Sequence, residues 1–246
     1  AAIRVKYNIN DELYAQIGAY NQNPSQLETG NGFKLSGSGT KGTIIPVELV
    51  WSPNVNSLPG EYRVGYYKST AKADDVREDA NGNDAAVSGD AYRSHSSKSG
   101  YWFVAQQQLT DHNGDKSRGL SIAANATFHD KDTNVVDNYQ NLMLVYKGPF
   151  NARPKDDVGI GIARIHVNED AQKNRKLING VNGIDDYDNP AFLPIQDTEY
   201  NAEINYGFHV TNWLTVRPNL QYVKHPGGVD QVDDAIVAGL KIQSVF

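Results

Sequence analysis

The chain has 246 residues and a formal net charge of −6, with 22 glycines and 14 tyrosines but one methionine and no cysteine. The lack of cysteine excludes disulfides, iron–sulfur clusters and thiol nucleophiles, and an acidic chain without a basic stripe is unsuited to binding nucleic acid. A mean hydropathy of −0.56 excludes membrane-spanning helices of about 20 apolar residues, whereas membrane β-strands expose only every second residue to lipid and stay compatible with it.

Alternation of apolar and polar residues predicts antiparallel strands along the whole chain. In chain order they cover residues 3–7, 13–20, 45–51, 61–68, 101–109, 122–128, 138–147, 158–167, 200–208, 214–222 and 235–246. The alternation is clearest where Tyr200, Ile204 and Phe208 share one face and Asn201 and Asn205 share the other. These are about eleven strands, most of them close to the length that crosses a bilayer at a tilt.

The predicted connections between these strands are of two sizes. Short ones lie at residues 8–12, 52–60, 111–117 and 147–157, and long ones at residues 21–41, 69–98 and 168–195. A membrane barrel has this asymmetry, with short turns on the periplasmic side and longer loops outside. No boundary or repeat interrupts the strands, so we expect one domain over residues 1–246.

Three local features refine this prediction. A short helix is expected within residues 71–80, and the register is expected to be irregular at residues 130–137. Pro46 and Pro218 fall inside strand patterns. Because proline has no N–H to donate to a ladder, we expect each to mark a bulge or an early strand position.

Aromatic residues tend to fall toward the ends of the predicted strands, as at Trp51, Tyr62, Trp102, Tyr200, Trp213 and Tyr222. Membrane proteins carry such residues in belts at the two membrane–water interfaces. The alternative is a soluble β-sandwich that fills its core with the same aromatics.

The last predicted strand favours the membrane barrel. It places Ile236, Leu240, Ile242 and Phe246 on one face and ends in an aromatic residue, with Ser244 as the one departure from the pattern. It looks like the assembly signal of outer-membrane proteins, which predicts the barrel assembly machinery as a partner that recognises Phe246.

Five stretches of the sequence resemble the carbohydrate-selective porins of the OprB family. They are residues 27–34 (LETGNGFK), 46–51 (PVELVW), 203–207 (EINYG), 217–222 (RPNLQY) and 225–228 (HPGG). The resemblance implies an all-β transmembrane antiparallel barrel of sixteen strands in the outer membrane of a Gram-negative bacterium. It also implies passive, selective diffusion of monosaccharides such as glucose through a constricted pore, with no cofactor, and leaves monomer and trimer open.

About eleven strands are too few for that barrel. An open sheet would leave two unpaired edges, which lipid does not tolerate. We therefore expect the sequence to lack the N-terminal strands of the barrel.

A sugar-selective pore needs side chains that replace part of the sugar's hydration, and aromatic faces that stack on its C–H surfaces. Tyr14 and Tyr20 supply aromatics on the polar face of their strand. Opposed arginine and glutamate side chains would orient sugar hydroxyls as donors and acceptors. The predicted pore-lining residues are Arg4, Glu48, Arg63, Gln106, Gln108, Glu203 and Arg217.

Signals for an enzyme or a metal site are weak. The six histidines show no metal-ligand spacing, and the sequence has no nucleophile elbow and no phosphate loop. Residues 111–115 open like a calcium loop, but Lys116 and Ile122 stand where that loop needs Gly and Glu, so we predict a hairpin turn. We predict no catalytic residue and no metal ligand. The alternatives left open are a general non-selective porin and a soluble carbohydrate-binding module.

Overall fold

The computed structural model describes residues 2–27 and 39–245, and its main feature is one antiparallel sheet. Eleven strands follow each other in it, and each pairs with its neighbours in chain order. They are β1 (Ala2–Asn8), β2 (Leu13–Gln22), β3 (Gly42–Trp51), β5 (Leu58–Ser69), β8 (Lys98–Gln108), β9 (Gly119–His129), β10 (Val136–Lys147), β11 (Asp157–Val167), β12 (Thr198–His209), β13 (Leu214–Lys224) and β14 (Ala235–Ser244). A short strand, β4 (Asn54–Val55), pairs with β5. The predicted all-β fold is confirmed, and each of the eleven predicted strands occurs in this sheet.

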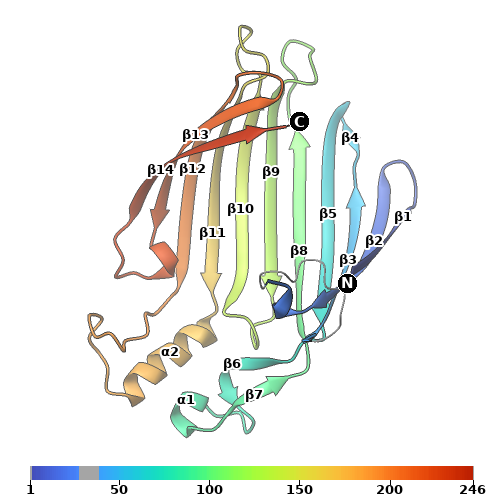
Figure 1. Cartoon of the computed structure of the whole chain (residues 1–246). Coiled ribbons are helices and arrows are strands. Elements are labelled where there is room, and N and C mark those ends of the chain that lie inside the picture. The colour runs from blue at the N-terminus through green and yellow to red at the C-terminus, as the bar shows by residue number, and fades with distance from the viewer. Residues whose placement is uncertain (1, 28–38, 246) are drawn as a thin grey trace.

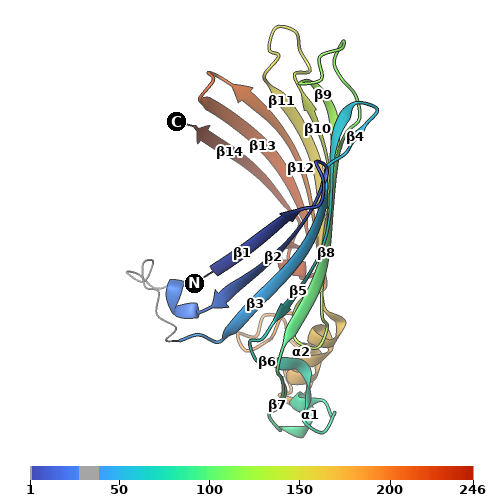
Figure 2. The same cartoon turned by 90° about the vertical axis from the view of Figure 1, so that its right-hand side faces the viewer.

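The sheet is curved into an open trough. Seen from the side, the two ends of the strand order, β1 and β14, bend toward the same side (Figure 2). Within the part of the chain that the structure describes, β1 pairs only with β2 and β14 only with β13. Both edges of the sheet therefore carry unpaired backbone groups.

The connections alternate between the two ends of the trough. Tight turns gather at the end where β14 finishes, and the longer connections gather at the other end (Figure 1). The long connections contain η1 (Pro24–Leu27), β6 (Ala73–Asp79), α1 (Ala85–Ser88), β7 (Tyr92–His95), α2 (Glu169–Val181) and η2 (Pro226–Gly228). No helix among the described residues is long and apolar enough to cross a membrane.

Two local predictions in the long connections need correction. Residues 73–79 form β6, which pairs with β7, so the helix expected within residues 71–80 is wrong. Helix α2 was missed. Its start has a recognisable signal, because the Asn168 side chain accepts a hydrogen bond from the Asp170 N–H and Glu169 and Asp170 place negative charge in the first turn.

The two strand prolines cause no bulge. Ile17 pairs with Val47 and Tyr20 with Ile44 in one register, so β2 and β3 stay aligned on both sides of Pro46. The β12–β13 ladder likewise keeps its register past Pro218, which lies in the middle of its strand. Each proline only interrupts one ladder locally, and the neighbouring hydrogen bonds hold the alignment. An irregularity does occur between Val136 and Asn138, at the end of the predicted range of residues 130–137.

The two faces of the sheet differ in polarity and exposure. Apolar side chains on the convex face stay open, with Ile162 at 58%, Ile204 at 51% and Leu240 at 64% exposure. Side chains on the concave face converge, and Glu48 and Val50 are 9% and 0% exposed. A convex apolar band with a polar interior is the arrangement of a membrane barrel.

The strand aromatics predicted to form belts at the membrane interfaces lie on the convex face, with one exception. Trp51 and Tyr62 lie together on the convex face near the short turns, with ring centroids 5.5 Å apart, and Tyr200 and Tyr222 lie toward the long connections. Trp102 was predicted in the same belt, but it lies on the concave face. Its indole reaches past β5 to a side chain on β3.

Candidate functional site

The first polar group on the concave face centres on Glu48 and is called the Glu48 cluster here: Gln16, Glu48, Glu61, Arg63 and Trp102. Glu48 accepts hydrogen bonds from Gln16 Nε2 at 2.7 Å and from Trp102 Nε1 at 2.8 Å. Arg63 donates from Nε and Nη2 to Glu61 Oε1, and its Nη1 lies 3.7 Å from Glu48 Oε1. Two carboxylates thus share one guanidinium, and since each carboxylate can accept about four hydrogen bonds, part of their acceptor capacity is unused.

Glycines make room for two aromatic rings beside this cluster. A Cβ at Gly65 would lie 2.0 Å from Trp102 Cζ2, and a Cβ at Gly18 would lie 2.4 Å from Tyr20 Cε2. Both rings therefore lie against the sheet. With Arg4 they border a hollow of about 200 Å³, lined by Arg4, Gln16, Ile17, Gly18, Tyr20, Pro46, Glu48 and Trp102.

The second polar group, the Glu203 cluster, consists of Asp157, Glu203, Asn205, Arg217 and Gln221. Glu203 accepts hydrogen bonds from Asn205 Nδ2 at 2.8 Å and Gln221 Nε2 at 2.7 Å. Arg217 binds Asp157 through both terminal nitrogens and donates to Asn205 Oδ1 at 2.7 Å. The Arg217 guanidinium is therefore largely satisfied inside the protein.

Asp157 was not predicted as a site residue. It is the first residue of β11 and is 8% exposed. Gly207 lies opposite it, and a Cβ there would lie 2.5 Å from Asp157 Oδ2 and 2.7 Å from Arg217 Nη2. The pair needs this glycine. Asp157 and Arg217 are 60 residues apart, so no local pattern could have joined them.

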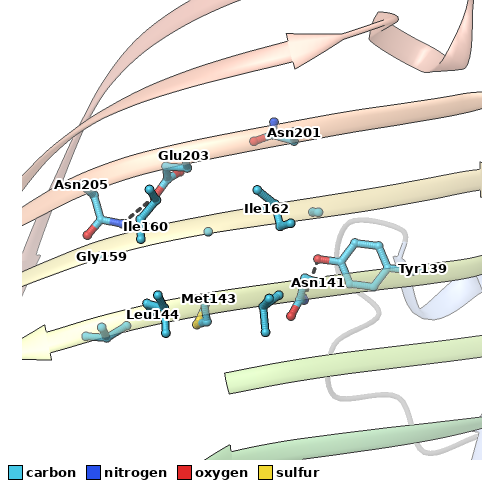
Figure 3. Close-up of a pocket in the computed structure, with 14 residues that line it drawn as sticks. Tyr139, Asn141, Met143, Leu144, Gly159, Ile160, Ile162, Asn201, Glu203 and Asn205 are labelled. Atoms are coloured by element: carbon cyan, nitrogen blue, oxygen red, sulfur yellow. Dashed lines mark hydrogen bonds between the residues drawn. The ribbon is translucent and has the colours of Figure 1, made fainter. Parts of the chain in front are cut away.

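A floor with few charged side chains adjoins the Glu203 cluster. It is a hollow of about 190 Å³ over β10, β11 and β12, where Gly159 and Gly161 supply no side chain. Tyr139 and Asn141 lie at one end of it, hydrogen-bonded to each other, and Glu203 and Asn205 lie at the other (Figure 3). Glu203 is the one charged residue among those that line it.

The predicted pore-lining residues fall in different places. Arg4, Glu48 and Arg63 lie on one arm of the trough, and Gln106 joins them because it pairs with Glu61. Glu203 and Arg217 lie together on the other arm. Gln108 is separate, because its amide donates to the carbonyls of Thr110, Lys116 and Arg118 and so holds the β8–β9 turn.

The remaining sequence motifs have structural roles in turns and bends. Residues 111–118 form the predicted turn, with the Gly114 N–H bound to Asp111 Oδ1 at 2.9 Å. Residues 225–228 make a bend in which Gly227 and Gly228 take φ values of 71° and 73°. Within residues 2–27 and 39–245, no three histidine or acidic side chains gather where a metal ion could bind. Residues 28–34 of the first family-like stretch, and Phe246, lie outside the described residues.

Comparison with known proteins agrees with this architecture. The model of the carbohydrate-selective porin family, OprB, matches residues 1–246. The chain belongs to this family. Its membership confirms the resemblance and the outer-membrane location, and porins are transport channels and not enzymes.

Individual relatives match almost all of this chain. Porin B of Pseudomonas aeruginosa is 68% identical over 247 residues, which are 100% of this chain and 54% of that protein. The putative porin QuiX of Acinetobacter baylyi is 40% identical over 250 residues, or 98% of this chain and 54% of that protein. The chain thus spans about half the length of these curated relatives.

Two solved structures also match. The high-pH structure of Pseudomonas putida OprB superimposes with a TM-score of 0.97 at 70% identity, covering 99% of this chain and 58% of that chain. The low-pH structure of Pseudomonas putida OprB gives a TM-score of 0.61 at 45% identity, covering 99% and 54%.

Proposed function

We propose that this chain forms the larger part of an outer-membrane pore through which monosaccharides such as glucose diffuse selectively. The observation that carries the proposal is the difference in polarity between the two faces of the sheet. Hydrogen-bonding groups and two aromatic rings line the concave face, and apolar side chains cover the convex face. Such a wall is wet inside and compatible with lipid outside.

Closure of the pore is part of the same proposal. Strands outside this chain would pair with β1 and β14, since both edges are free among the described residues and lipid does not tolerate open sheet edges. The curated relatives, almost twice as long as this chain, offer enough sequence for them. We further propose that the barrel assembly machinery recognises the β14 end of the chain through Phe246.

Selectivity would come mainly from the hollow beside the Glu48 cluster. Glu48 can accept from a sugar hydroxyl, and Arg4 can donate to one. The Trp102 ring offers a flat apolar face for sugar C–H groups. Binding must remain weak, because a solute that binds tightly would not leave the pore.

The decisive experiment is single-channel conductance of the natural protein in a planar bilayer. Glucose is titrated into the bath, and a neutral polyol of similar size serves as the control solute. Concentration-dependent block by glucose alone supports the proposal. Conductance indifferent to both solutes would overturn selectivity and support the second candidate, a general non-selective porin.

A pair of variants tests the location of the site. Glu48→Gln should weaken glucose block, and Glu169→Gln, an equal change of charge on the exposed start of α2, should not. Equal effects of the two variants would contradict a specific role for the concave face.

A further inference from the structure

One row of the convex face changes from apolar to cationic where the strands approach the long connections. Gln140 pairs with Arg164, Arg164 with Tyr200, and Tyr200 with Lys224, so the row crosses β10, β11, β12 and β13 without interruption. The next row toward the middle of the sheet is apolar and includes Leu142 and Ile162. The cationic row therefore marks the edge of the lipid-facing band.

The two cations of this row are available to a ligand. Arg164 donates to Asn138 Oδ1 at 2.5 Å, and neither Arg164 nor Lys224 forms an ion pair with a carboxylate among the described residues. The nearby carboxylates are engaged elsewhere. Asp137 binds His166, and Asp234 binds the Tyr222 hydroxyl and the His225 N–H.

The spacing of the row suits a phosphate. Neighbouring strands are about 4.8 Å apart, so the backbones at Arg164 and Lys224 are separated by about 10 Å, within reach of two long side chains. Tyr200 lies between them and is 46% exposed. Guanidinium binds phosphate through two parallel hydrogen bonds, and an exposed aromatic ring at this level packs against lipid.

We propose that Arg164, Tyr200 and Lys224 form a binding site for the phosphate group of an anionic outer-leaflet lipid. The long connections are on the outer side of a membrane barrel, which places the row at the headgroups of that leaflet. The inference rests on membrane insertion and is independent of what passes through the pore.

The test uses the natural protein, stripped of lipid in nonionic detergent, and measures binding by native mass spectrometry. Its ligands are bisphosphorylated lipid A, dephosphorylated lipid A and inorganic phosphate. The Arg164→Gln/Lys224→Gln variant should bind bisphosphorylated lipid A about tenfold more weakly or worse, since each cation near a membrane surface contributes appreciably to anionic lipid binding. Wild type should bind dephosphorylated lipid A as weakly as the variant binds bisphosphorylated lipid A. It should bind inorganic phosphate more weakly still.

Two further variants control for net charge and folding. Lys116→Gln/Lys155→Gln removes the same charge at the short turns and should bind lipid A like wild type. Arg164→Lys/Lys224→Arg keeps both cations and should retain most of the affinity. Unchanged binding by the glutamine pair would overturn the proposal. Equal binding of dephosphorylated lipid A, or equally tight binding of inorganic phosphate, would also overturn it.

Discussion

Each of the two polar clusters on the concave face combines an arginine, two carboxylates and a glutamine, but they differ in how far their charges are satisfied. In the Glu203 cluster, Asp157 holds Arg217 through both terminal nitrogens. In the Glu48 cluster, Glu48 and Glu61 share Arg63, and Glu48 also accepts from the Trp102 indole. A charged side chain on the concave face is thus a candidate for sugar binding only if its neighbours leave part of its hydrogen-bonding capacity unused.

This difference in charge satisfaction predicts different roles for the two arms of the trough. The Asp157–Arg217 pair joins the start of β11 to β13 across β12, which stiffens the wall. The Glu48 cluster borders a hollow that also holds the Trp102 and Tyr20 rings. We therefore expect stability to depend more on the Glu203 cluster, and sugar binding more on the Glu48 cluster.

The largest expected effect is on stability. Asp157→Asn leaves Arg217 without its ion pair in a partly buried site, which should lower the free energy of unfolding by about 2–3 kcal/mol. Glu61→Gln, in the more exposed pair with Arg63, should cost about 1 kcal/mol or less. Urea titration of the folded barrel in detergent measures both. Equal losses would remove the distinction between the clusters.

The next effect is on sugar affinity. Glu48→Gln removes a charged acceptor and should weaken glucose block of the pore about tenfold, since hydrogen bonds to charged groups contribute about 1.5–3 kcal/mol. Arg217→Gln should change it less than about twofold, because the guanidinium is already engaged by Asp157. Conductance titration with glucose compares them. A larger effect of Arg217→Gln would reverse the assignment.

A smaller effect is expected from the aromatic face. Trp102→Ala removes a stacking surface and should weaken glucose block about fivefold. Trp102→Phe keeps a face and loses the donor to Glu48, so its effect should be about twofold. Trp213→Ala, in the exposed β12–β13 turn, provides the control and should leave block unchanged. Similar values for both alanine variants would contradict a role for Trp102.

The last effect is confined to acid, below pH 3.8. Burial opposes the charge of Asp156, but hydrogen bonds from Arg153, the Tyr206 hydroxyl and the His209 N–H lower its pKa from 3.8 to about 2. The stabilisation is complete above pH 3.8 and is lost as the pH falls toward about 2, because the folded state binds its proton at lower pH than the unfolded state. Unfolding titrations between pH 5 and 2 should show a shallower decline for Asp156→Asn. An identical decline would show that other carboxylates dominate.

Much of the fold could be predicted because strand alternation is a local property. The paired faces of β12 and β13 follow directly from the period of two, which also placed Glu48, Glu203 and Arg217 on the concave side. Helix α2, which the alternation pattern does not predict, also has a local signal, because its capping Asn168 is followed by two acidic residues. Trp102 lies outside the predicted belt because it shares the concave parity of Gln106 on β8, which its place near a strand end does not reveal.

The sequence by itself determined which side chains share a face, where the chain turns and to which family it belongs, because backbone geometry imposes these patterns on a few consecutive residues. Only the tertiary structure decided that Asp157 satisfies Arg217, that Gly65 accommodates Trp102, and that the sheet is curved. These depend on register between strands far apart in the chain. A shift of one residue would exchange the two faces, so contacts across the sheet exist only once all its strands are paired.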